Sequence, residues 1–162
     1  MKELQVVQNA AARVTTKTRK FDHITPVLRQ LHWLPVRKRI VYKLAVMVYK
    51  CLHGLAPPYL AAYCVPVTSV ASRRQLRSAQ SGCLAVTGTR TTLGRTNFAV
   101  AGANIWNNLP ADLRLQSQSL LTFGQKLKQY LFEPGAHLRN FLFQVALYKC
   151  SHYYQTSYTA RH

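Results

Sequence analysis

The strongest constraint on this fold is the stretch from His23 to Leu60, in which two proline-marked helix starts precede an apolar stripe and a glycine stop. Thr25 followed by Pro26 is typical of an N-cap and a first helical position, because proline has no N–H to lose there. The pair predicts a short helix from Pro26 to about His32.

Pro35 opens a second and longer predicted helix, from Val36 to about His53, because the residue before a proline is held extended. Gly54 suits the left-handed position past the end of this helix, and two following prolines prevent its resumption. Apolar residues recur at spacings of three, four and seven, which places them on one helical face. They are Val36, Ile40, Val41, Leu44, Val48, Cys51 and Leu52.

The same helix carries the densest positive charge in the chain. Its cations are Arg37, Lys38, Arg39, Lys43 and Lys50. The first three crowd the first turn, where the helix macrodipole disfavours each cation by roughly 0.3–1 kcal/mol. Exposed backbone N–H groups at this end favour an anion such as a phosphate. A solvated face of a basic protein is the alternative interpretation. The unfavourable position of the cations favours an anionic partner.

The charge of the whole chain points the same way. Its 162 residues, 48% of them hydrophobic, suit one domain with a core. Against 22 lysines and arginines stand 4 acids, which gives a net charge of +18. A domain with so few internal counter-charges collects polyanions, of which nucleic acid is the commonest in a cell. Ten of the cations lie between Arg13 and Lys50, and five more lie between Arg73 and Arg95.

The second basic zone begins with SRRQLRSAQSG, at residues 72–82. Arg73, Arg74 and Arg77 suit a loop that contacts phosphates, because arginine forks match phosphate oxygens. A disordered linker explains the segment equally well. The residues after it have strand-like composition, and two glycines bracket a turn, so a short hairpin is expected between Cys83 and Leu93.

Further helices follow from periodicity and from stop signals. They are expected at Leu4 to Thr16, Pro58 to Cys64, Asn97 to Pro110 and Ser119 to Phe132. Trp106 is predicted to be a core residue rather than a platform for base stacking. Gly124 should weaken the last helix by about 1 kcal/mol relative to alanine.

The expected fold is therefore mainly α, a small irregular helical bundle with a short β-hairpin. Residues 1–64 form a basic helical unit, and residues 65–96 form a loop rich in Ser, Arg and Gly that contains the hairpin. Residues 97–133 supply the C-terminal helices of the same domain, and residues 134–162 are an unplaced tail.

No metal, cofactor or membrane span is expected. The four cysteines show no CxxC spacing, and the six histidines do not complete a zinc-finger pattern with them. The longest uncharged run, Cys51 to Ser72, is broken by glycine and prolines. Free thiols in a reducing compartment are expected, and the localisation is intracellular, in the nucleus or cytoplasm, rather than secreted.

Five segments together resemble one protein family. They are LQVVQNAAARV near the start, the stretch from His23 to Leu60, SRRQLRS, the FAVAGANIWNNLPADLR run and the LTFGQKLKQYLF helix. In this order they resemble the C-terminal region of reverse transcriptases from LINE-type, non-LTR retrotransposons, in the branch of the jockey and chicken-repeat elements. The resemblance spans Leu4 to Phe132, and HWLP, YKCLHGLAPPYL and IWNNLP are distinctive together.

The resemblance implies the helical part that follows the palm domain, namely the thumb and what lies beyond it, which handles template RNA and primer. In that family the polymerase site lies upstream, in a palm whose paired aspartates hold magnesium. This sequence has no adjacent acidic pair, so it lacks ligands for two-metal nucleotidyl transfer. It also departs from the family at GRTNF, where an acid usually follows the glycine, and at Gly124, where lysine is usual.

Two functional hypotheses from different classes follow. The first is a non-catalytic fragment that binds RNA or DNA without sequence preference, through phosphate contacts from the five helix cations and the three loop arginines. The second is a helical interaction module, or a relic without function, that packs its apolar faces on a polymerase palm domain or another protein. An independent enzyme has least support, because the acids are too few and too scattered for acid–base pairs.

Overall fold

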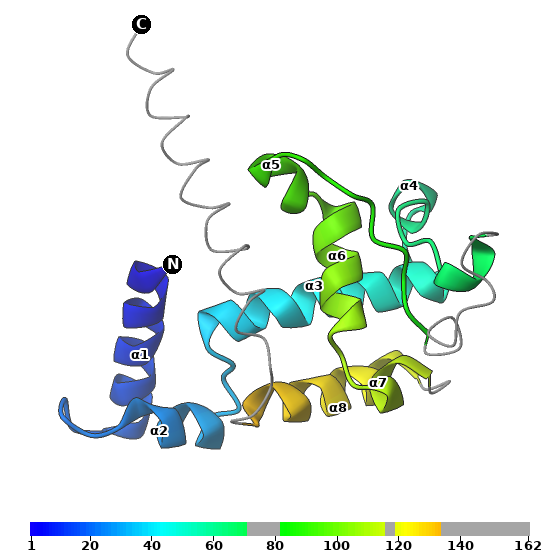
Figure 1. The fold of residues 1–162 in the computed structure, drawn as a ribbon. Helices are drawn as coiled ribbons and strands as arrows, with labels where there is room; N and C mark the ends of the chain where they lie inside the picture. Colours follow the sequence, from blue (N-terminus) through cyan, green and yellow to red (C-terminus); the bar gives the residue numbers. More distant parts are fainter. Residues whose placement is uncertain (71–81, 116–118, 134–162) are drawn as a thin grey trace, which may run out of the picture.

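The fold is built around α3 (Val36–Leu52), the longest helix among the described residues, which runs through the middle of the molecule (Figure 1). The computed structural model describes residues 1–70, 82–115 and 119–133. The described part is mainly α-helical, as expected. Its elements besides α3 are α1 (Lys2–Thr16), α2 (Ile24–Gln30), α4 (Pro58–Ala61), a 3-10 turn η1 (Val67–Ser69), α5 (Thr92–Arg95), α6 (Phe98–Asn107), α7 (Ala111–Leu115) and α8 (Leu120–Phe132).

The signals that predicted α3 also fix its ends. The helix begins at Val36, directly after Pro35. At its C-terminus Gly54 adopts a positive φ of 69°. The Leu55 N–H donates to the carbonyl of Lys50 over 2.8 Å, which satisfies one of the last helical carbonyls. The predicted glycine stop is confirmed.

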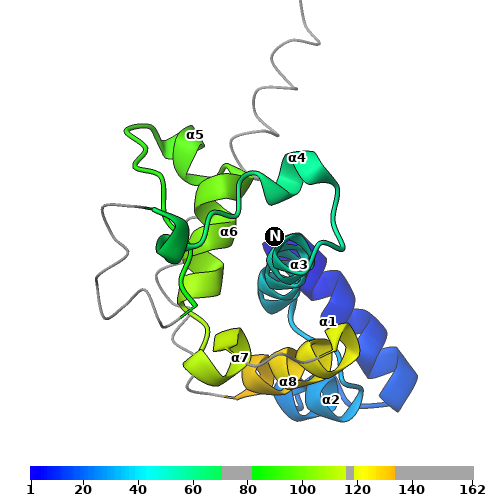
Figure 2. The same ribbon diagram turned by 90° about the vertical axis from the view of Figure 1, so that its right-hand side faces the viewer.

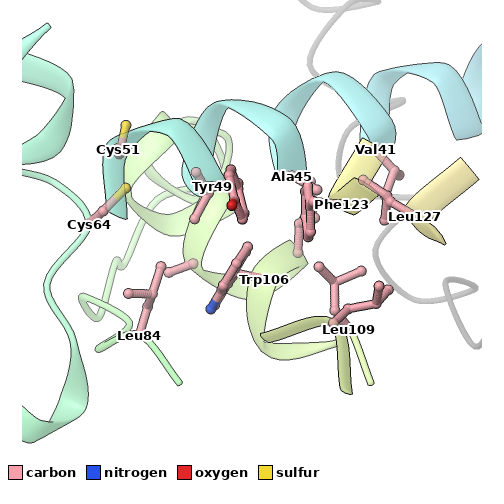
Figure 3. Packing of buried hydrophobic residues seen from close by; sticks show 14 of the residues in the cluster. Val41, Ala45, Tyr49, Cys51, Cys64, Leu84, Trp106, Leu109, Phe123 and Leu127 are labelled. Carbon is pink, nitrogen blue, oxygen red and sulfur yellow. The ribbon is translucent and has the colours of Figure 1, made fainter. Parts of the chain in front are cut away.

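The main core forms where α6 and α8 pack against one side of α3. Seen nearly along its axis in Figure 2, α3 has α6 and α8 as neighbours and α1 on its other side. The rings of Tyr49 and Phe123 stack with their centroids 4.4 Å apart (Figure 3). Trp106 is 2% exposed and donates its indole N–H to the Gly82 carbonyl over 2.8 Å, so its predicted core position is confirmed.

A smaller second cluster joins α1 to α2. Its buried members are Ala12, Val27 and Leu28, and Trp33 packs against them from the linker. Ala12 is the one buried residue of α1, whereas Val7 and Val14 are 65% and 80% exposed. Most of the apolar surface of α1 is therefore left facing solvent.

The prediction of a hairpin between Cys83 and Leu93 is wrong. The described residues contain no strand, and Gly94, expected in a turn, lies inside α5. Leu84 instead forms an isolated antiparallel bridge with Pro66. The side chain of Asn107 also accepts from the Leu84 N–H at 2.8 Å and donates to its carbonyl at 2.9 Å. Because distant residues supply the partners of Leu84, residues 83–93 do not fold back on themselves as a hairpin.

Several helix boundaries also differ from the expected ones, those of α2 and α4 among them. Helix α2 begins at Ile24, with His23 as its N-cap, so Thr25 lies in the first turn rather than at the cap. Pro26 still fits, because the first turn has N–H groups without helical partners. Helix α4 ends at Ala61 instead of continuing to Cys64, although single turns extend the chain as far as Cys64.

Candidate nucleic-acid interface

The predicted cations of α3 occupy different environments. Arg37, Arg39 and Lys43 are exposed, whereas Lys38 and Lys50 are half-buried. The core face of the same helix carries Val41, Ala45 and Val48, all of which are fully buried.

Arg39, Lys43 and Lys50 lie on the side of α3 that faces away from the core. Successive helical residues are about 100° apart, so spacings of four and seven keep these three on one stripe, roughly opposite Val41 and Val48. With a rise of 1.5 Å per residue, the stripe from Arg39 to Lys50 is about 16 Å long. No acidic residue occurs in α3, so the stripe meets no opposite charge on its own helix.

Lys38 points to the other side of the helix and binds within the protein. Its Nζ donates to the carbonyl of Leu131, and Arg29 donates to the carbonyl of Phe132 over 2.9 Å. These are among the last carbonyls of α8, where the helix dipole favours cations. Burial, with a smaller contribution from Arg29, lowers the pKa of Lys38. Lys38 therefore helps to hold α8 against α3.

The N-terminus of α3, predicted as a phosphate site, is partly occupied by α1. The Val36 N–H donates to Oε1 of Gln5 over 2.8 Å. Gln8 from the next turn of α1 donates to the Leu34 carbonyl over 2.9 Å. Two neutral amides thus satisfy main-chain groups at this end of the helix.

Other cations also donate to main-chain oxygens, which sequence reasoning missed. Arg114 donates to the Asn107 carbonyl at 3.0 Å and to Sγ of Cys83 at 2.9 Å. Arg13 donates to the Asp22 carbonyl at 2.9 Å. No local sequence signal marks such pairs, because their acceptors are main-chain atoms that every residue carries.

The three loop arginines of the prediction, Arg73, Arg74 and Arg77, lie outside the described residues. Of the predicted cations, Arg39, Lys43 and Lys50 share the outer stripe of α3.

The described cysteines are free thiols. Cys51 at the end of α3 and Cys64 after α4 lie side by side at one edge of the main core (Figure 3). Burial and the neighbouring Cys51 raise the pKa of Cys64 to about 12.

The described ranges contain no cluster of three or more His, Cys, Asp or Glu side chains that could hold a metal ion. Among the helices of the same ranges, none is both long and apolar enough to cross a membrane. No protein-family model, no curated protein and no solved structure matches the chain.

Proposed function

We propose that this protein binds RNA or DNA through phosphate contacts along α3, as a non-catalytic unit like the post-palm region of a LINE-type reverse transcriptase. The observation that carries the proposal is the stripe of Arg39, Lys43 and Lys50 on the outer side of α3; Arg37 is exposed in the first turn of the same helix. Contacts of this kind position a nucleic acid without reading its sequence.

Two further observations support this function. Only 4 acids stand against 22 lysines and arginines, and half-buried cations such as Lys38 and Arg114 already donate to main-chain oxygens. The exposed cations of α3 therefore have solvent and counterions as their neighbours, which a polyanion would displace with a gain in counterion entropy. The resemblance of residues 4–132 to a template-handling region agrees with such a ligand.

The experiment is fluorescence-anisotropy titration of the full chain with labelled single-stranded RNA, duplex DNA and an RNA/DNA hybrid, at 50 and 200 mM salt. The test variant carries Arg37→Gln, Arg39→Gln, Lys43→Gln and Lys50→Gln. If all four side chains contact phosphates, the log–log salt slope with single-stranded RNA should fall by about 3, at roughly 0.7 per contact.

A variant of equal charge loss provides the control. It carries Arg90→Gln, Arg95→Gln, Lys126→Gln and Lys128→Gln, which lie outside the α3 stripe. We expect the control to retain most of the affinity and the salt slope. Equal losses in the two variants would show that binding follows net charge, and an affinity that is unchanged by salt would refute phosphate contacts.

A further inference from the structure

An open apolar groove lies between α1 and the N-terminal half of α3. Figure 2 shows that α1 and α6 lie on different sides of α3. Its volume is about 610 Å³. The lining consists of Leu4, Val7 and Gln8 from α1, Trp33 from the linker, and Val36, Arg39, Ile40 and Lys43 from α3.

The apolar part of the lining is not closed by the protein itself. Leu4 and Val7 lie one turn apart on α1 and are 53% and 65% exposed. Val36 and Ile40 lie one turn apart on α3 and are half-buried, as is Trp33 between the two helices. Two aliphatic stripes with helical spacing thus face one trough, which is the arrangement that receives the apolar face of a docked helix.

The charge of the rim selects the kind of helix. Arg39 and Lys43 line the groove together with the apolar residues, and no lining residue is acidic. A second copy of this chain, with a net charge of +18, would be repelled. The residues after Glu133 contain no acid either, so they would not match the rim. A nucleic acid offers phosphates for the rim but no aliphatic surface for the two stripes.

We propose that this groove docks an amphipathic helix of another protein, one whose apolar face is flanked by acidic residues. Leucine-type side chains at positions i, i+3, i+4 and i+7 would enter between α1 and α3. Glutamates or aspartates beside them would meet Arg39 and Lys43. This docking site goes beyond nucleic-acid binding, and it draws on Leu4, Val7 and Ile40, which phosphate contacts do not need.

The test uses a fluorescein-labelled 18-residue amphipathic peptide with leucines at that spacing and glutamates on both flanks. One comparison peptide has lysines in place of the glutamates, and another has the acidic sequence scrambled. Binding to the full chain is followed by anisotropy. We expect the acidic amphipathic peptide to bind at least about tenfold more tightly than either comparison peptide, because only it buries an apolar face and also pairs with the rim.

A pair of matched valines on α1 locates the site. Val6 and Val7 are both 65% exposed, so neither change should disturb the fold, but only Val7 lines the groove. Val7→Gln should weaken the acidic peptide about tenfold, and Val6→Gln should leave its affinity unchanged. Equal effects of the two variants would overturn the proposal.

A charge swap tests the rim. The double variant Arg39→Glu and Lys43→Glu should weaken the acidic peptide about fivefold or more and strengthen the lysine-flanked peptide. Loss of both peptides, or equal binding of the scrambled peptide, would refute helix docking. Dimerisation that depends on Val7 in sedimentation experiments would assign the groove to a second copy instead. RNA titration of Val7→Gln separates the two proposals, since that variant should bind RNA like the wild type.

Discussion

The close approach of α6 to α3 depends on Gly102, and substituting this residue tests the packing of the core. A Cβ built at Gly102 would lie 3.0 Å from Cγ2 of Val48, which is fully buried on α3. Glycine to alanine within a helix gains about 0.8–1.0 kcal/mol in propensity. Overpacking of a filled core costs typically 1–3 kcal/mol. We therefore expect Gly102→Ala to lower the free energy of unfolding by about 1 kcal/mol, or the Tm by about 4 °C.

Gly124 in α8 supplies the matched comparison. Its added Cβ would meet only the ring end of Tyr42, with Oη at 2.9 Å, and Tyr42 is half-buried. Because that ring end can shift toward solvent, we expect Gly124→Ala to raise stability by about 0.5 kcal/mol through helix propensity.

Urea unfolding followed by circular dichroism at 222 nm measures both changes. A double-mutant cycle of Gly102→Ala with Val48→Ala should show a coupling free energy of about 1 kcal/mol, because the second substitution removes the opposing methyl. The reasoning is refuted if Gly102→Ala is as stable as the wild type, or if the two changes in the cycle are additive.

Four further outcomes are expected. Asn107→Ala should cost about 1–3 kcal/mol in urea unfolding, since it removes both hydrogen bonds to the main chain of Leu84. Lys38→Gln should change RNA affinity in anisotropy titrations by less than about twofold, because its Nζ is bound to α8 and meets no phosphate. The pKa of Cys64, about 12 in the fold against an ordinary 9.0, keeps the thiol protonated when the unfolded chain has lost that proton. Stability should therefore fall as pH rises from 9 toward 12, and Cys64→Ala should remove this part of the loss in urea titrations at pH 8 and 10. Amide hydrogen exchange should be faster in α1 than in α3, because α1 buries one residue and α3 buries five.

The helices could be predicted because their signals are local. Pro35 and Gly54 mark the ends of α3, Asn97 and Ser119 accept hydrogen bonds as caps of α6 and α8, and periodicity indicates the buried faces. Trp106 could be placed in the core for the same reason, since its helix has one strongly apolar side. Prolines, glycines, caps and apolar periodicity all act on backbone within a few residues of their own positions.

Local signals could not show that the predicted hairpin is absent, because the partners of Leu84 are Pro66 and Asn107, which lie far away along the chain. The role of Arg29 was equally hidden, since its acceptor is 103 residues away. The groove depends on how α1 is placed against α3, and α1 is held there by the amides of Gln5 and Gln8. Side-chain amides that bind main-chain atoms carry no sequence pattern of their own.

The run of Arg37, Lys38 and Arg39 shows why a block of charge in a sequence does not act as a block in a helix. Neighbouring residues point about 100° apart, so Lys38 reaches α8 while Arg39 lies on the outer stripe. A nucleic-acid strand along α3 would therefore meet cations at spacings of four and seven, not three in a row. Removing Arg39 should then weaken RNA binding more than removing Lys38, although the two substitutions change the net charge equally.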